Sequence, residues 1–396
     1  MPVRTYDGDT PPADRRGIRD QARVLITNPD MLHIGILPHH TQWATLFENL
    51  HWVVLDELHV YRGVFGSNVA NLLRRLKRIC RFYGSDPRFA LTSATIANPK
   101  ELAEKLIELP VRLIAPDLDG SPRPEKHVIL YNPPVVDPAL GIRRAYTLEA
   151  TRIAERFLRA GVQTAVFARA RLTTELLLGY VRDGVERSGG DPLTIRGYRG
   201  GYLPLERREI EKGLRDGSVR GVVATNALEL GVDIGQLGAA VIAGYPGTIA
   251  SLWQQAGRAG RRSDVSAAVL VASGAPLDQF VAANPRYLFE NPPEHGLINP
   301  DNLAILLRHL RCAAFELPFE AGESFGSYQE VGELLDFLAD EGVLHRSDGV
   351  YRWIADSYPA ERASLRSGEH ATVGIQEVGQ GRPIVIGEVD RATAPI

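Results

Sequence analysis

Short apolar runs alternate with longer stretches of helical periodicity along the first 115 residues. The runs predict strands and the periodic stretches predict helices. The predicted strands are Arg23–Thr27, Trp52–Leu55, Arg88–Thr95 and Val111–Ile114, and the predicted helices are Phe65–Phe82 and Pro99–Glu108. Trp52–Leu55 is a continuous apolar run that ends at two acids, which is typical of a buried strand in a parallel sheet. The residues up to Asp20 are polar and rich in turn formers, so no element is predicted there.

A second alternating block follows Ala115–Pro124, a stretch rich in Pro, Gly and Asp. Its predicted strands include His127–Pro134, Gln163–Arg169 and Ala239–Pro246, and its predicted helices include Ile142–Ala160 and Leu172–Val185. Alternation of strand and helix indicates an α/β fold with parallel sheets. We therefore expect two α/β domains, residues 1–115 and 116–290.

The pattern changes after residue 290. A helical stretch, a second helix and then a hairpin turning at Ser347–Gly349 predict a winged-helix-like domain over residues 291–366. Residues 367–396 alternate and turn at Gly379–Pro383, as expected for the start of a small β unit that the chain does not complete.

Composition narrows the class of protein. The chain has 396 residues, 44% of them hydrophobic and 23% charged, which is ordinary for a globular protein. The formal net charge of -3 argues against a wholly basic nucleic-acid coat but allows a local basic face. Two distant cysteines, Cys80 and Cys312, support neither a disulfide framework nor a cysteine zinc site. We expect a cytoplasmic protein, because neither a long apolar run nor an apolar signal region occurs.

Two groups of polar residues follow predicted strands of the first domain. Asp56 and Glu57 follow Trp52–Leu55, where one acid could hold Mg²⁺ through water and the other could polarise an attacking water. The alternative is a solvated acidic loop. The sequence TSAT, Thr92–Thr95, ends the neighbouring strand, and its hydroxyls could hydrogen-bond an adjacent carboxylate. The alternative for TSAT is ordinary turn chemistry.

A third group lies near the end of the second domain. Gln254, Arg258 and Arg261 are separated by four and three positions, with glycines between them. Arginines three apart on a helix share a face, and such a pair aimed at phosphate is what an arginine finger requires. A plain surface arginine cluster is the alternative.

Six motifs in order carry a resemblance to a known family. They are TNPDML, DELH, TSAT, AVFARAR, ATNALELGVDIG and QQAGRAGR. They resemble motifs Ib to VI of superfamily 2 nucleic-acid helicases. The segments TYDGDTP, DELHVYRGVFGSNVANLLRRLKRI and YRGGYLPLERREIE resemble the DEAD/H-box group of bacterial mitomycin repair factor A, whose members are ATP-dependent DNA helicases that translocate 3′ to 5′. The resemblance implies two RecA-like lobes, the first incomplete, then the winged-helix-like region.

The resemblance also implies roles for individual residues. Asp56 would serve Mg²⁺, Glu57 the attacking water, and Gln254, Arg258 and Arg261 the γ-phosphate across the cleft between the lobes, with Arg261 as the finger. Coupling of hydrolysis to motion would fall to His59, Ser93 and Thr95. Gly231 and Asp233 would approach the nucleotide, Asp233 at the ribose. Nucleic-acid backbone contacts would come from Thr27, Asn28, Asp30 and Thr225, joined by Tyr198, Arg199 and Gly200; simple loop packing is the alternative for Tyr198.

Two basic features stay open. The segment LLRRLKRICRF carries Arg74, Arg75, Lys77, Arg78 and Arg81 between apolar residues, which predicts an amphipathic helix with a solvated basic face; a strand-binding surface is the alternative. His345, Arg346 and Arg352 of the predicted hairpin could lie near duplex, or the winged helix could be a packing module.

Two parts that the resemblance implies are missing from the sequence. No GxxxxGKS or GxxxxGKT loop occurs, and no four-cysteine C-terminal domain follows. We therefore expect the chain to be an internal piece of a longer helicase, with absent or feeble ATP hydrolysis of its own. The expected cofactors are ATP and Mg²⁺. We expect a monomer whose partner is DNA, single-stranded or tailed, with RNA as an option. A non-catalytic nucleic-acid-binding protein and an RNA helicase are the alternative functions.

Overall fold

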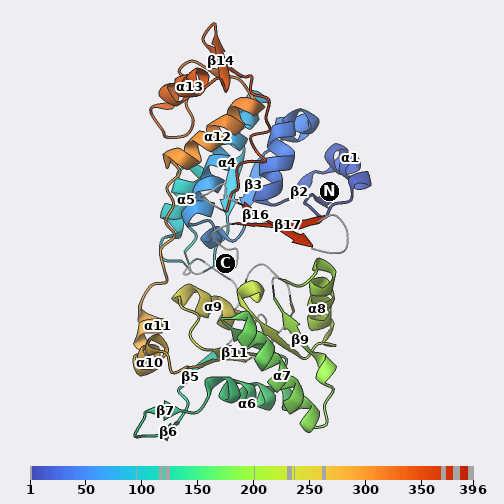
Figure 1. Ribbon diagram of the computed structural model, residues 1–396, viewed down its shortest axis with the longest axis vertical. Coiled ribbons are helices and arrows are strands. Elements are labelled where there is room, and N and C mark those ends of the chain that lie inside the picture. Colours follow the sequence, from blue (N-terminus) through green and yellow to red (C-terminus); the bar gives the residue numbers. More distant parts are fainter. Residues whose placement is uncertain are drawn as a thin grey trace. The chain divides into compact units, whose positions relative to one another are not determined.

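The computed structural model describes residues 2–94, 96–115, 118, 120, 125–199, 201–229, 234–235, 237–260, 265–366, 372–377 and 384–390. The chain forms two compact units (Figure 1). The first unit combines Met1–Ser93, Asn98–Leu113 and Gly296–Ile396, and the second combines Ala94–Ala97 with Ile114–His295. Among the described residues, no helix has the length and apolar character needed to cross a bilayer.

Parallel strand pairs form the α/β part of the first unit. β1 (Val3–Thr5) pairs with β2 (Val24–Ile26), and β3 (Trp52–Leu55) pairs with β4 (Arg88–Leu91). Three of the four predicted strands are thereby confirmed, Trp52–Leu55 with the predicted bounds and the other two in shortened form. The fourth is wrong: Val111–Ile114 is not a strand, and the backbone N–H of Val111 bonds to the Glu104 side chain instead of to a neighbouring strand.

The burial predicted for β3 is also wrong. Trp52 is 55% exposed and Val54 is 65% exposed, while Val53 and Leu55 are half-buried. Successive strand side chains point to opposite faces, so a strand that is covered on one face exposes every second residue. A continuous apolar run cannot show from sequence alone whether both faces are covered.

The first unit contains helices that the sequence pattern did not predict, of which α1 (Pro12–Gln21) is the longest. This helix is almost entirely polar and buries only Ile18. Proline at its first position suits a helix start, because that position needs no backbone N–H donor. The two predicted helices are confirmed as α4 (Gly63–Phe82) and α5 (Pro99–Ile107). Short helices α2 (Pro29–Met31) and α3 (Ala44–Glu48) complete this part.

The solvated basic face predicted for α4 is contradicted by burial. Arg74, Arg75 and Arg78 are 2%, 0% and 7% exposed, so they form neither a solvated face nor a strand-binding surface. All three pair with carboxylates that are distant in sequence. Arg74 pairs with Glu108 and Asp301, Arg75 with Glu316, and Arg78 with Glu323. The pattern of basic residues between leucines describes an amphipathic helix, but only tertiary partners distant in sequence decide that three of these charges are buried.

Arg75 is the central residue of this buried network. Its guanidinium pairs with Glu316 at the end of α12 (Leu303–Glu316), and its Nη1 lies 2.6 Å from Nδ1 of His33. Burial holds the pKa of His33 near 3, with Arg75 adding to the effect, and the pKa of the fully buried His309 is also well below its usual range. Both rings are therefore neutral at physiological pH, and α4 is joined to α12 through charge as well as apolar packing.

The winged-helix prediction is confirmed in the same unit. α12 is followed by β13 (Phe319–Glu320), α13 (Val331–Asp340), β14 (Leu344–Ser347) and β15 (Val350–Trp353), with strand order β13-β15-β14. The hairpin turns through Asp348 and Gly349, which have φ of 51° and 75°. Two consecutive left-handed residues are the requirement of a tight two-residue hairpin. β16 (Thr372–Glu377) pairs antiparallel with β17 (Ile384–Asp390); the predicted turn at 379–383 lies outside the described residues.

The second unit is built on a six-stranded parallel sheet. Its strand order is β5-β12-β11-β8-β10-β9. The strands are β5 (Lys126–Tyr131), β8 (Thr164–Ala168), β9 (Ile195–Tyr198), β10 (Gly221–Ala224), β11 (Ala239–Ala243) and β12 (Ser266–Val271). The central strands are buried throughout, as runs rich in Val, Ile and Ala require. β6 (Val135–Asp137) and β7 (Ile142–Arg143) form a small hairpin. β7 takes the first two residues of the predicted helix Ile142–Ala160.

Helices cover both faces of this sheet (Figure 1). α6 (Tyr146–Arg159) and α7 (Arg171–Arg187) pack on one face through residues such as Ala154 and Leu177. α8 (Pro204–Asp216), α9 (Ile249–Gly257), α10 (Pro276–Ala283) and α11 (Arg286–Glu290) pack on the other. The expected doubly wound α/β architecture is confirmed for this unit.

Candidate functional site

The two acids of the first unit lie at the carboxyl ends of paired parallel strands. The register pairs Leu55 of β3 with Leu91 of β4, so Asp56 and Thr92 are the next residues on the two chains. The Thr92 hydroxyl donates a hydrogen bond to Oδ1 of Asp56. Backbone bonds from Thr92 to Leu55 (2.9 Å) and from Leu58 to Thr92 (2.8 Å) hold the segments together. The DELH and TSAT motifs therefore form one site at this sheet edge.

Backbone geometry orients the second acid. Glu57 has φ of 55°, in the left-handed region, and its backbone N–H donates to Oδ1 of Asp56 at 2.9 Å. A non-glycine residue in this region is uncommon and costs free energy, so such positions concentrate at functional sites. This conformation brings Oε2 of Glu57 to 3.5 Å from Nδ1 of His59. Asp56 is exposed and Glu57 is half-buried, so both remain accessible to a ligand.

His59 is buried behind the acids. Burial lowers the pKa of His59 below its ordinary value, and the Glu57 carboxylate opposes this shift. The ring is therefore neutral near pH 7, and its contact with Glu57 is a polar contact of a neutral ring rather than a fixed ion pair. A neutral ring beside the carboxylate that is predicted to polarise water suits the coupling role predicted for His59.

Sequence reasoning missed the residue of TSAT that makes the contact. It selected Ser93 and Thr95, whereas the structure shows Thr92 bound to Asp56. Ser93 is exposed in the next position, and Thr95 lies outside the described residues. The signal was available in the strand register, because aligning the last apolar residues of the two predicted strands places Thr92 beside Asp56.

The residues predicted for nucleic-acid contact in the first unit lie in one segment after β2, where Thr27 and Asn28 are exposed and the half-buried Asp30 lies in the first turn of α2. The Thr27 hydroxyl donates to the Tyr6 carbonyl at 2.7 Å. Asn28 caps α2 by accepting a bond from the backbone N–H of Met31 at 2.8 Å. Oδ2 of Asp30 lies 3.0 Å from Nη2 of Arg366. Sequence reasoning missed Arg366, since no local pattern links it to a residue 336 positions away.

The corresponding residues of the second unit differ in accessibility. Thr225 follows β10 and its hydroxyl accepts a bond from the backbone N–H of Ala227. Tyr198 is 2% exposed and its hydroxyl donates to Glu211 at 2.8 Å. Burial and this bond raise the pKa of Tyr198 to about 12. The geometry favours the packing alternative for Tyr198, while the half-buried Arg199 pairs with Glu175 at 3.3 Å.

Residues in and next to α9 are hydrogen-bonded to Glu229, which follows β10. Gln255 Nε2 and Ser251 Oγ donate to Oε1 of Glu229, at 2.5 and 2.9 Å, and Arg258 Nη2 donates to the Glu229 backbone carbonyl. Arg258 is buried, whereas Gln254 is half-buried on α9. Sequence reasoning selected Gln254 and Arg258 but missed Glu229 and Gln255, which connect the ATNALELGVDIG and QQAGRAGR motifs.

The amino end of α9 is capped by a residue from after α11. The Glu294 carboxylate accepts hydrogen bonds from the backbone N–H groups of Ile249 (2.8 Å) and Ala250 (3.1 Å). The Thr248 hydroxyl is the N-cap of the helix and accepts a bond from the backbone N–H of Ser251. A carboxylate at a helix N-terminus satisfies free donors and complements the helix dipole. The position of Gln254 and Arg258 is therefore set from both ends of α9. Gly200, Gly231, Asp233 and Arg261 lie outside the described residues.

The acid pair fits Mg²⁺ better than a metal with a full set of protein ligands. Among the described residues, no group of three or more His, Cys, Asp and Glu side chains could hold a metal ion. Mg²⁺ is commonly held by one or two carboxylates, with water and phosphate oxygens completing its coordination. Exposed Asp56 suits this arrangement.

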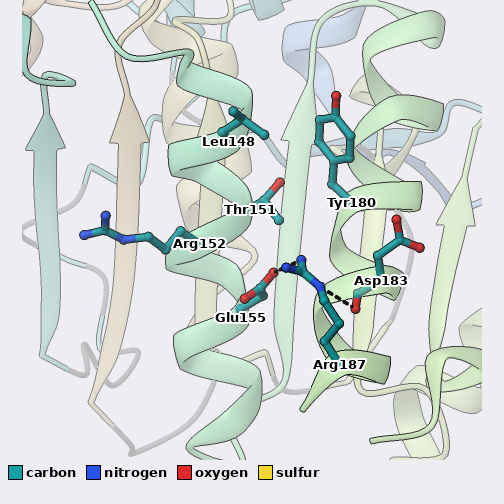
Figure 2. Close-up of a pocket in the computed structure, with 7 residues that line it drawn as sticks. All are labelled: Leu148, Thr151, Arg152, Glu155, Tyr180, Asp183 and Arg187. Carbon is teal, nitrogen blue, oxygen red and sulfur yellow. Dashed lines mark hydrogen bonds and ion pairs between the residues drawn. The ribbon is translucent and has the colours of Figure 1, made fainter. Parts of the chain in front are cut away.

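A separate hollow of about 260 Å³ lies between α6 and α7 (Figure 2). It is lined by Leu148, Thr151, Arg152, Glu155, Tyr180, Asp183 and Arg187. The Arg187 guanidinium contacts Glu155 at 3.8 Å and the Asp183 carbonyl at 3.1 Å. No candidate motif residue lines this hollow, so we do not assign it to the site.

Comparison with protein families identifies three domains. Residues 2–102 match the DEAD/DEAH box helicase family and residues 150–263 match the helicase conserved C-terminal domain. Residues 298–368 match the winged helix domain of ATP-dependent helicase HRQ1.

Individual relatives agree with these matches. The chain is 56% identical to the uncharacterized ATP-dependent helicase YprA of Bacillus subtilis, over 98% of this chain and 52% of YprA. It is 38% identical to ATP-dependent helicase HRQ1 of Saccharomyces cerevisiae, over 98% of this chain and 37% of HRQ1. The crystal structure of DUF1998 helicase MrfA bound to DNA and AMPPNP superposes with a TM-score of 0.89 at 54% identity, covering 99% of this chain and 54% of that one.

The chain thus spans about half the length of YprA and less of HRQ1. These matches cover both α/β units and the winged helix at high identity. The chain belongs to the DEAD/DEAH-box helicases of superfamily 2, in the group that includes MrfA.

Proposed function

We propose that the chain forms the core of an ATP-dependent DNA helicase that translocates 3′ to 5′ along a single strand in DNA repair. The observation that carries this proposal is the contact between Thr92 and Asp56, which joins two helicase motifs at one sheet edge. The MrfA structure with DNA and AMPPNP supports DNA and a nucleoside triphosphate as the ligands.

Different residues of the chain would bind Mg²⁺, activate the attacking water and stabilise the phosphate charge. Asp56 would hold Mg²⁺ through water, and Glu57 would orient and polarise the water that attacks the γ-phosphate. Arg258 and Arg261, with Gln254, would face the developing phosphate charge, and Arg261 would be the finger. Bound Mg²⁺ would neutralise part of the negative charge on the phosphates.

Strand contacts would be electrostatic and independent of sequence. Thr27, Asn28 and Thr225 would contact the phosphate backbone, with Arg199 and Gly200 adding to them. Phosphate contacts of this kind position a strand without reading its bases. Affinity should then fall as salt rises.

ATP hydrolysis and strand binding test the proposal separately. We would measure DNA-stimulated ATP hydrolysis and oligonucleotide binding for this chain and for the same reading frame extended upstream in its genome. The expected result is strand binding by both forms and DNA-stimulated hydrolysis by the extended form, abolished by Glu57→Gln with binding retained. Strand binding without hydrolysis in either form would instead establish the non-catalytic alternative.

The nucleic acid is tested in the same assay. Matched DNA and RNA oligonucleotides, single-stranded and tailed, are compared at one salt concentration. We expect DNA to bind more tightly and to stimulate hydrolysis more strongly. Equal or stronger stimulation by RNA would favour an RNA helicase.

A further inference from the structure

Arg366 is held at the surface of the first unit beside the segment of Thr27, Asn28 and Asp30. Its Nη2 lies 3.0 Å from Oδ2 of Asp30, and its guanidinium carbon lies 4.4 Å from the centre of the Phe65 ring. The Phe65 ring in turn lies 5.7 Å from the ring of Tyr61, centre to centre. The guanidinium is therefore fixed on one side by a carboxylate and on one face by an aromatic ring.

This fixed guanidinium remains accessible. The Arg366 side chain is 63% exposed, although it makes two specific contacts. The ion pair uses Nη2 alone, while a guanidinium carries five N–H donors in a rigid fork that matches phosphate geometry. An arginine that is already ordered loses little further freedom on binding, so its contact with a phosphate is favoured.

The negative charge of Asp30 suits a role in orienting Arg366 better than a direct contact with phosphate. A carboxylate repels the phosphate backbone, so Asp30 is a poor direct ligand for it. Its carboxylate contacts Arg366, and it lies in the first turn of α2, directly after Thr27 and Asn28. A carboxylate at this place can contribute by orienting the cation that binds the strand.

We infer that Arg366 contacts a backbone phosphate of single-stranded DNA and that Asp30 is the positioning residue for its guanidinium. The inference rests on the proposed function, because it requires a DNA strand along the segment of Thr27, Asn28 and Asp30. It changes the role of Asp30 from a direct strand contact to an indirect one, and it adds a residue from the end of the winged-helix region to the strand path.

Equilibrium binding of a fluorescently labelled oligothymidylate tests the inference on the chain itself. Arg366→Ala should weaken binding about tenfold, as expected for loss of a charged hydrogen bond. It should also reduce the slope of log affinity against log salt by about 0.7, the value for one phosphate contact with a single strand. Arg366→Lys, which keeps the charge but loses the fork, should fall between wild type and Arg366→Ala.

Arg362→Ala is the matched control. Arg362 is an exposed arginine four positions away, so its removal changes net charge equally without touching Asp30 or Phe65. We expect its affinity to stay within about twofold of wild type, since general electrostatics is screened beyond a Debye length. Equal losses for Arg362→Ala and Arg366→Ala would overturn the inference.

Asp30→Asn separates positioning from direct contact. The amide oxygen can still accept a bond from Arg366, while the negative charge that repels the strand is removed. Binding should therefore be unchanged or tighter. A loss as large as that of Arg366→Ala would show that Asp30 itself contacts the strand.

Failure of the inference is distinguishable from failure of the proposed function. If the wild-type chain does not bind the oligonucleotide, the proposed function fails. If it binds and Arg366→Ala behaves as wild type, only the role of Arg366 is lost. Thermal unfolding of each variant checks the fold, and a normal affinity for Arg366→Lys together with a destabilised Arg366→Ala would reduce Arg366 to a structural contact.

Discussion

Thr92 donates its hydroxyl hydrogen to Asp56 across two parallel strands, and this bond joins the DELH and TSAT motifs. The two residues are 36 positions apart, and the β3–β4 register brings them together. Asp56 is also the acceptor for the backbone N–H of Glu57. The orientation of both acids therefore depends on one hydroxyl group from the neighbouring strand.

Replacing Thr92 should affect hydrolysis more than replacing its neighbour. Thr92→Val keeps the side-chain shape and removes the bond to Asp56, so we expect DNA-stimulated ATP hydrolysis to fall about tenfold or more. Ser93→Ala is the neighbouring control and should have a smaller effect. Both would be measured in the extended form of the chain. A larger loss for Ser93→Ala would return the coupling role to Ser93.

Breaking the buried Arg75–Glu316 pair should strongly destabilise the first unit. Glu316→Gln leaves a buried guanidinium without its counter-charge, which costs about 3–5 kcal/mol of unfolding free energy. The double variant Arg75→Met with Glu316→Leu should recover much of this loss, because apolar replacements of both partners leave no unpaired charge. Urea unfolding measures the unfolding free energy of the wild type, of Glu316→Gln and of the double variant. Arg81→Ala, at the exposed end of α4, is the control and should change stability by less than about 0.5 kcal/mol.

Stability should fall with acid through the buried histidines. The pKa of His33 is lowered from 6.5 to about 3, so the unfolded chain binds a proton that the folded chain does not. This contribution is fully present above pH 6.5 and is lost as the pH falls toward 3. At pH 5 the loss from His33 is about 2 kcal/mol. His33→Gln should flatten the acid side of a stability–pH curve measured by urea unfolding, whereas the exposed His51→Gln should not.

Two glycines should respond to alanine in opposite directions. A Cβ at Gly66 of α4 would meet the Tyr61 backbone carbonyl and lie 2.5 Å from Ile298 Cγ2. Gly66→Ala should therefore destabilise by about 1–3 kcal/mol. A Cβ at Gly179, inside α7, meets nothing within 4 Å, so Gly179→Ala should stabilise by about 0.5–1 kcal/mol. Thermal unfolding compares them, and destabilisation of both would contradict the packing around Gly179.

The sequence pattern was sufficient where local order decides the structure. Buried strands such as β8 and β11, the helices between them and the hairpin at Asp348–Gly349 follow from short-range apolar patterns and turn residues. Motif order also placed Asp56, Glu57 and the TSAT segment at strand ends. It did not select Thr92 over Ser93, because that choice depends on the β3–β4 register.

By itself, the sequence determined the fold class, the order of the elements and which motifs carry acids, hydroxyls and arginines. Only the tertiary structure decided that Trp52 and Val54 are exposed, that Arg75 is buried against Glu316, and that Arg366 lies against Asp30. The physical reason is that propensity and periodicity act over a few residues, whereas burial and ion pairing depend on partners hundreds of positions away. A charged residue on an amphipathic helix has the same local pattern whether water or a distant carboxylate faces it.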